Sequence, residues 1–156
     1  MAGTGSTQAV PRAEGRTVLI VEARFHAAIN DLLLAGARAV LDAAGARTTV
    51  VTVPGALEIP TAIALAERSG RFAAYVALGC VIRGETGHYD LVAGESCRGL
   101  VDLGLERGAL IGNGILTVET EAQALVRADP AQLDKGGDAA RAALVLLALA
   151  RELASA

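Results

Sequence analysis

The sequence has very few aromatic residues: two Phe, two Tyr and no Trp among 156 residues. Hydrophobic residues still make up 53% of the chain, so we expect a core of Ala, Val, Leu and Ile. Charged residues reach only 20%, and the formal net charge at pH 7 is −3. This composition argues against a disordered chain and against a general polyanion-binding protein, which carries excess positive charge. We therefore expect one globular domain and no nucleic-acid partner.

Cysteine is also scarce, because Cys80 and Cys97 are the only two in the chain. They form no CxxC pair and have no nearby pair of histidines, which excludes a disulfide framework and a zinc site. The first residues, MAGTGSTQAVPRAEGRT, lack an apolar run behind a basic start, so we expect no signal peptide and a cytoplasmic location. The longest apolar run, 142–150, would extend only about 14 Å as a helix, so we expect no membrane span.

Short apolar runs alternate with helical patterns along most of the chain. We expect residues 1–15 to form a flexible N-terminal arm and residues 16–156 to form a single domain. The alternation predicts an α/β fold of three layers, with a four-stranded parallel, flavodoxin-like sheet flanked by helices. The predicted strands are Thr17–Ala23, Arg47–Val53, Ala73–Ile82 and Ala109–Leu116, and the predicted helices are Ala27–Ala44, Leu57–Ser69, Tyr89–Glu106, Glu121–Arg127 and Gly137–Ala154.

The last predicted helix, which contains DAARAALVLLALARELA, bears on assembly. Its apolar residues run around the whole helix instead of forming one stripe, so a single chain would leave one side uncovered. The alternative is a helix that its own chain encloses completely. Because a terminal helix beside a four-stranded sheet is seldom enclosed in that way, we expect a homo-oligomer.

In an open parallel sheet, ligands bind beyond the carboxyl ends of the strands. Phe25 follows the first predicted strand, where it either fills the core or stacks on a ligand ring. In VPGALEIP, after the second strand, a tight turn at Pro54 is followed at once by a helix. The amides of Ala56 and Leu57 are then free to bind a ligand. Glu58 either binds the ligand as well or only interacts with the helix dipole, and for an isolated glutamate the second interpretation is favoured.

The stretch after the third strand, CVIRGETGHYD, contains the densest group of candidate residues. Gly84 and Gly87 let the backbone approach a ligand, Thr86 offers a hydroxyl, and a helix N-terminus follows, which suits a phosphate or another oxyanion. A Walker-type lysine is absent, because Lys135 is the only lysine in the chain. His88 lies at the helix start, where it is either a surface residue or a proton carrier for chemistry near neutral pH.

After the fourth strand, Thr120 is a predicted N-cap for the short helix that ends at Arg127. Arg127 is either a bidentate partner for an oxyanion or an ordinary arginine in the last turn of a helix, and spacing alone favours the second interpretation. The residues by themselves therefore predict a cofactor-free pocket for a small phosphorylated ligand. They leave the reaction open.

Several motifs together resemble the lumazine synthase family. In order they are RFHAAINDLLLAGA, VPGALEIP, ALGCVIRGETGHYD, NGILTVET and EAQALVRA followed by DKGG, and the resemblance covers nearly the whole chain from Val18 onward. It implies a transferase for the penultimate step of riboflavin biosynthesis. The reaction condenses 5-amino-6-(D-ribitylamino)uracil with 3,4-dihydroxy-2-butanone 4-phosphate to 6,7-dimethyl-8-ribityllumazine, phosphate and water, without a metal or an organic cofactor.

The resemblance also assigns roles to individual residues. Of two implied catalytic residues, His88 moves protons during imine formation and phosphate loss, and Arg127 clamps the phosphate. The implied substrate-binding residues contact the pyrimidine ring, the ribityl chain, the uracil edge and the phosphate, and they are Phe25, Ala56, Leu57, Glu58, Cys80, Val81, Ile82, Glu85, Thr86, Asn113 and Lys135.

Three positions depart from the family pattern. Asn113 stands where many members carry an aromatic residue that reaches into the neighbouring subunit's site, and its amide is able to bond the pyrimidine instead. His26 replaces the usual polar amide after the phenylalanine, and residues 129–137 lack their usual glycine-rich character. The family forms pentamers, some of which assemble twelvefold into hollow shells. The resemblance thus implies a homopentamer or a 60-subunit shell and leaves both open.

Two other functions fit the same fold. One is a non-catalytic relative, either a carrier of flavin or lumazine or a shell protein, with a vestigial site. The joint presence of His88, Arg127, Thr86 and Glu58 argues against it, because a binding module needs no proton carrier. The other is a flavodoxin-like nucleotide-binding protein, which the absence of a phosphate loop with several Ser or Thr residues disfavours.

Overall fold

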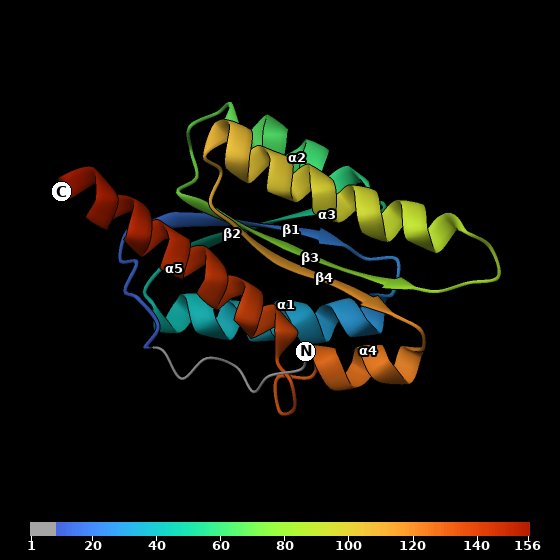
Figure 1. Ribbon diagram of the computed structural model, residues 1–156. Coiled ribbons are helices and arrows are strands. Elements are labelled where there is room, and N and C mark those ends of the chain that lie inside the picture. The colour runs from blue at the N-terminus through green and yellow to red at the C-terminus, as the bar shows by residue number, and fades with distance from the viewer. Residues whose placement is uncertain (1–8) are drawn as a thin grey trace.

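A four-stranded parallel sheet separates two layers of helices in the computed structural model, which describes residues 9–156 (Figure 1). The strand order is β2-β1-β3-β4, and this architecture confirms the predicted three-layer α/β fold. The elements in chain order are β1 (Thr17–Ala23), α1 (Ala27–Ala43), β2 (Arg47–Val53), α2 (Glu58–Glu67), β3 (Ala74–Ile82), α3 (His88–Arg107), β4 (Ile111–Val118), α4 (Glu121–Ala128) and α5 (Lys135–Ser155).

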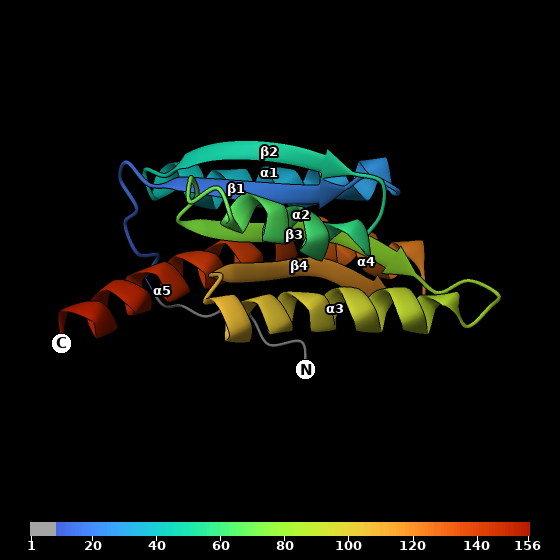
Figure 2. The same cartoon turned by 90° about the horizontal axis from the view of Figure 1, so that it is seen from above.

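The two faces of the sheet have separate apolar cores. Helices α1, α4 and α5 cover one face, and α2 and α3 cover the other (Figures 1 and 2). Successive residues of β1 alternate between the two cores: Ile20 packs with Leu33 and Leu144, whereas Val21 packs with Ile59. The central strands β1 and β3 are therefore buried on both sides, which explains why their sequences are continuous apolar runs.

Four predicted boundaries differ from the structure by two residues: both ends of β4, the start of α5, and the end of α2, which stops at Glu67 instead of Ser69. Strand β4 runs from Ile111 to Val118 instead of Ala109 to Leu116. Gly108 ends α3 in a left-handed conformation with φ of 68°, and the amide of Ala109 still donates to the carbonyl of Leu103. Helix α5 begins before its predicted start because the side chain of Asp134 caps it, accepting a hydrogen bond from the Gly137 amide at 3.1 Å.

The expected N-terminal arm is described only in part, because residues 1–8 lie outside the described residues. Near its end, the Ala13 amide donates to the carbonyl of Ala44 at 2.8 Å, and the Ala13 side chain is buried. Arg12 Nη1 donates to the carbonyl of Ala43 at 3.2 Å. Residues 12 and 13 therefore pack against the C-terminal end of α1.

Helix α5 is covered by its own chain over only part of its length. Ala140, Ala143, Leu144 and Leu147 are buried against α1 and the sheet. Leu153 is 67% exposed, in the last turns of α5, which extend beyond the sheet at the C-terminal end (Figure 1). None of the helices in residues 9–156 is long and apolar enough to cross a membrane.

Glycines allow α5 to lie very close to the sheet and to α1. A Cβ atom at Gly112 of β4 would overlap the carbonyl oxygen of Ala139 in α5. A Cβ atom at Gly136 would likewise overlap the carbonyl oxygen of Leu33 in α1. The position of α5 thus depends on backbone contacts that no larger residue permits.

Candidate active site

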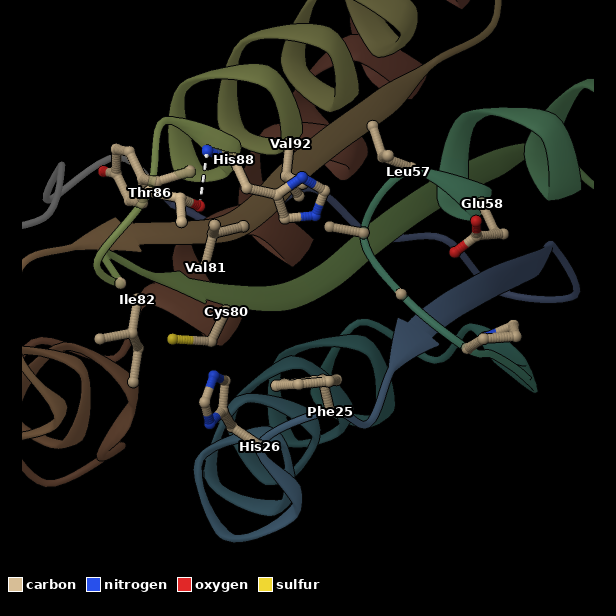
Figure 3. Close-up of a pocket in the computed structure, with 15 residues that line it drawn as sticks. Phe25, His26, Leu57, Glu58, Cys80, Val81, Ile82, Thr86, His88 and Val92 are labelled. Carbon is tan, nitrogen blue, oxygen red and sulfur yellow. Dashed lines mark hydrogen bonds between the residues drawn. The ribbon is translucent and has the colours of Figure 1, made fainter.

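The segments that follow β1, β2 and β3 line a single cleft of about 550 Å³ beyond the carboxyl ends of these strands (Figure 3). The cleft has mainly apolar walls with a few polar groups, as is usual for small-molecule sites. Its lining residues are Phe25, His26, Pro54, Gly55, Ala56, Leu57, Glu58, Cys80, Val81, Ile82, Gly84, Thr86, His88, Tyr89 and Val92.

Phe25 lies in the three-residue connection between β1 and α1. Its side chain is 81% exposed, so it does not fill the core, and the first of the two sequence-based alternatives for this residue is wrong. Its ring meets the ring of His26 edge to face, with centroids 5.1 Å apart. Figure 3 shows Phe25 and His88 on opposite sides of the cleft, which leaves one face of the phenyl ring available to a flat ligand.

The start of α2 supplies backbone donors to the cleft. The amides of Glu58 and Ile59 donate to the carbonyls of Gly55 and Ala56, both at 3.2 Å, and so close the predicted tight turn. The Ala56 and Leu57 amides make no backbone hydrogen bond within residues 9–156. These two amides remain available to a ligand.

The end of β3 exposes part of its backbone. Pairing between β1 and β3 ends at Leu78, whereas pairing between β3 and β4 continues to Ile82. On the β1 side, the backbone of residues 80–82 therefore faces the cleft instead of a strand. Burial, with a smaller effect of Glu121, raises the pKa of the Cys80 thiol to about 11, so the thiol is protonated near neutral pH and does not act as a nucleophile.

The connection from β3 to α3 brings a hydroxyl and an imidazole to the cleft. Thr86 Oγ1 accepts a hydrogen bond from the His88 amide at 3.3 Å, drawn as a dashed line in Figure 3. His88 is the first residue of α3, so the Thr86 hydroxyl lies beside the positive end of a helix. This combination suits an anion, with a proton carrier in the same cleft.

Arg83 braces this connection, and our sequence analysis missed it. Its Nε atom pairs with Glu119 Oε2 at 2.9 Å, and its Nη2 atom pairs with Asp90 Oδ1 at 3.3 Å. Its guanidinium carbon lies 4.0 Å from the centroid of the Tyr89 ring. The only signal in the sequence was an arginine directly after a strand, because the partner Glu119 is 36 residues away.

Other lining residues had weak sequence signals. Tyr89 and Val92 lie one and four positions after His88 on α3, a spacing that places them near the same helix face. His26 also lines the cleft, although in the sequence it stands out only as a departure from the family pattern.

Nine of the thirteen predicted site residues line this cleft, and four do not. Glu85 is exposed in the connection between β3 and α3. Asn113, Arg127 and Lys135 line a second hollow of about 340 Å³ that lies between β4 and α5. Within one chain, the structure therefore does not bring the predicted phosphate clamp to the cleft that contains His88.

Arg127 and Lys135 bond within their own helices, whereas Asn113 also reaches α3, where its Nδ2 atom donates to Cys97 Sγ at 3.7 Å. Arg127 Nη1 donates to the carbonyl of Gln123 at 3.0 Å, within α4. Lys135 Nζ pairs with Asp138 Oδ2 at 2.8 Å, within α5. Asn113 Oδ1 accepts from the amide of Ile115 at 3.0 Å, within β4. Both cations are half-buried, and their accessible parts leave them able to meet an anion from outside.

Comparison with known proteins agrees with this geometry. A family model described as 6,7-dimethyl-8-ribityllumazine synthase matches residues 15–151. Proteins of that name from Methylobacterium radiotolerans and Novosphingobium aromaticivorans are 64% and 66% identical to the chain over 141 and 131 residues. These alignments cover 90% and 84% of the chain, and 86% and 94% of the two relatives. A third, from Sphingopyxis alaskensis, is 64% identical over 132 residues, 85% of the chain and 93% of the relative. The chain belongs to the 6,7-dimethyl-8-ribityllumazine synthase family.

Proposed function

We propose that the chain catalyses the condensation of 5-amino-6-(D-ribitylamino)uracil with 3,4-dihydroxy-2-butanone 4-phosphate. The products are 6,7-dimethyl-8-ribityllumazine, phosphate and water. One observation carries this proposal beyond family membership. An exposed phenyl ring, unpaired strand backbone, and a helix start that combines a hydroxyl with a histidine all meet in one cleft. The reaction needs these three features, because a flat amine must be held beside a phosphorylated ketone.

The pyrimidine substrate fits the apolar side of the cleft. Phe25 stacks on its ring, and the backbone of residues 80–82 bonds the polar edge of the uracil. The amides of Ala56 and Leu57, with the Glu58 carboxylate, hold the hydroxyls of the ribityl chain. The buried, protonated thiol of Cys80 keeps this wall of the cleft uncharged.

The ketone substrate places its phosphate at the start of α3. Thr86 and the connection that contains Glu85 contact the phosphate there, and the helix dipole stabilises its negative charge. The amine attacks the ketone carbonyl, and the carbinolamine loses a first water to give an imine. Phosphate then leaves as an anion, and the ribitylamino nitrogen closes the second ring onto the remaining carbonyl carbon with loss of a second water. His88 moves the protons for these steps, and anion stabilisation replaces any nucleophilic side chain.

Arg127, Lys135 and Asn113 complete the site from a neighbouring copy of the chain. They line a different hollow from His88, so a head-to-tail contact that brings the two hollows together builds one full site per interface. Such contacts form a ring when the rotation between neighbouring copies closes, and we propose the homopentamer, alone or within a 60-subunit shell. The uncovered end of α5 and the exposed Leu105 of α3 favour assembly.

Both cysteines are free, as expected in the reducing cytoplasm, where we place the reaction.

A direct assay tests this function. Purified protein is mixed with both substrates, and the absorbance of the lumazine product and the release of phosphate are followed together. We expect the two products in equal amounts. Binding of the lumazine without turnover would support the carrier instead, and binding of a flavin nucleotide without either substrate would support the flavodoxin-like alternative.

A further inference from the structure

A carboxylate is buried next to the cleft, and the reaction steps above do not use it. Glu22 is the penultimate residue of β1, and it is only 3% exposed. Thr52 Oγ1 of β2 donates to its Oε1 atom at 2.9 Å, and Asn30 Nδ2 of α1 donates to its Oε2 atom. Arg24 Nη1 pairs with the same Oε2 atom at 3.2 Å. A buried charge with donors from three segments is a costly feature that persists only when it is well paired.

Arg24 extends this cluster across the β1–α1 connection. Its Nη1 atom reaches back to Glu22 in the strand, and its Nη2 atom pairs with Asp31 in the first turns of α1. Asn30, the neighbour of Asp31, bonds Glu22 from the same helix. The cluster of Glu22, Arg24, Asn30, Asp31 and Thr52 therefore ties the end of β1 to the start of α1 on both sides of Phe25.

Phe25 depends on this cluster for its orientation. With 81% of its side chain exposed, the phenyl ring receives little support from packing, and its recorded aromatic partner is the adjacent His26. The direction of the ring is thus fixed mainly by the backbone of residues 24–26. A side chain that must present one face to a ligand needs such support from a second layer of contacts.

We propose that Glu22 is a positioning residue, which holds the β1–α1 connection so that the Phe25 ring faces the pyrimidine substrate. This inference rests on the proposed function, because it assumes that a flat substrate stacks on Phe25. Glu22 itself does not touch the substrate, since it lies among the buried side chains below the connection and does not line the cleft.

The substitution Glu22→Gln tests the proposal with little change in volume. The glutamine amide has one acceptor oxygen where the carboxylate has two, and its NH₂ group faces groups that themselves donate. The connection then loses its anchor, and the Phe25 ring samples other directions. We expect the Kd of the aminouracil, measured by calorimetry without the second substrate, to rise roughly tenfold. The KM of the butanone phosphate stays within about twofold of the wild-type value.

A double-mutant cycle with Phe25→Ala separates positioning from general damage. If Glu22 acts through the Phe25 ring, Glu22→Gln has no further effect on the aminouracil Kd once that ring is absent. A loss of affinity that adds to that of Phe25→Ala, or equal losses for both substrates, would overturn the proposal.

Thr48→Val is the matched control. Thr48 lies on β2 four residues before Thr52, and its buried hydroxyl finds no hydrogen-bond partner among residues 9–156. We expect this variant to bind both substrates like wild type, whereas an affinity loss equal to that of Glu22→Gln would point to a general effect of the sheet.

Should Glu22→Gln fail to fold, Asp31→Asn weakens the exposed end of the cluster, and we expect a smaller loss of aminouracil affinity in the same direction. Normal aminouracil binding by Asp31→Asn would then contradict the proposal. If wild type binds aminouracil but forms no lumazine, the proposed function fails, while the calorimetric cycle still decides the role of Glu22.

Discussion

His88 combines a structural role and a chemical one in a single residue. Its amide bonds the Thr86 hydroxyl, and its imidazole lines the cleft. We expect His88→Ala to lower turnover by roughly 100-fold, while binding of both substrates survives, because a positioned acid or base contributes about that much. Steady-state kinetics across a range of pH provide the measurement. The wild-type profile should contain a limb that is missing in the variant, and identical turnover and profiles would reduce His88 to a residue that only starts the helix.

Arg127 differs from His88, because no carboxylate among residues 9–156 pairs with it. It donates to the Gln123 carbonyl of its helix and borders the second hollow. We expect Arg127→Ala to weaken binding of the phosphorylated ketone by roughly tenfold or more and to leave aminouracil binding nearly unchanged, since a charge-assisted contact is lost. Separate titrations with each substrate test this. Equal losses for both substrates would mean that Arg127 supports the fold.

The Cys80 thiol gives a pH-dependent prediction. Its pKa is raised from 9.0 to about 11 in the folded chain, mainly by burial. Thiolate forms in the unfolded chain first as the pH rises, so folding stability should fall between pH 9 and pH 11. Denaturant unfolding of wild type and Cys80→Ala at pH 8 and pH 10.5 checks this. The pH-dependent loss should be smaller in Cys80→Ala, and the same loss in both proteins would contradict the assignment.

At the scale of helices and strands, the sequence predicted the elements well because each strand is one apolar run between clear helix signals. The short loops at Gly45 and Gly70, where the backbone has φ of 79° and 65°, also separate neighbouring elements clearly. The predicted start of β4 was wrong, because Ala109 and Leu110 are apolar residues that continue the strand pattern. In the structure, the Ala109 amide still bonds the carbonyl of Leu103 at the end of α3. The Lys135-Gly-Gly start of α5 was missed, since glycine disfavours helices and the Asp134 cap depends on a left-handed backbone that a sequence does not display.

The site was predictable to a similar degree. Motifs placed the connections after β1, β2 and β3 in one cleft, because parallel strands end on one edge of the sheet. The open backbone of residues 80–82 depends on where β1 stops pairing with β3, which is a matter of register. The Glu22 cluster joins residues of three elements, and nothing local in the sequence marks it.

The close contact between β4 and α5 supplies a prediction about stability. Gly112→Ala should destabilise the fold by about 3 kcal/mol or more, because the added methyl would overlap the Ala139 carbonyl and force the backbone to move. Thermal and denaturant unfolding give the measurement. Gly104→Ala, within α3, is the control, since its Cβ would make only an ordinary contact of 3.5 Å with the Ala109 carbonyl oxygen. We expect Gly104→Ala to be neutral or slightly stabilising, and equal effects of the two substitutions would rule out crowding as the cause.

For the whole molecule, the separation of His88 from Arg127 predicts complementation between subunits. At ketone concentrations well below KM, we expect His88→Ala and Arg127→Ala each to have low activity, and we expect co-assembly of the two chains to regenerate sites that contain both native residues. With random mixing, about a quarter of the sites are native if each is shared by two neighbouring copies. Activity of co-expressed mixtures against chain ratio provides the test. A mixture that stays as inactive as its components would place the complete site within one chain.

Strand β3 extends further toward the cleft than β1 does, and this difference determines how much of the β3 backbone lines the cleft. Strand β3 last pairs with β1 at Leu78, and Gly79 follows directly. The next three residues, 80–82, form the floor of the cleft, which is about 10 Å long at about 3.3 Å per residue. Lengthening β1 by two residues would keep every side chain on its present face, because the strand period is two, yet it would shorten the floor by more than half. The length of β3 backbone that is open to a ligand therefore depends on a difference between two strand lengths, and a change of two residues in that difference keeps the side chains on their present faces.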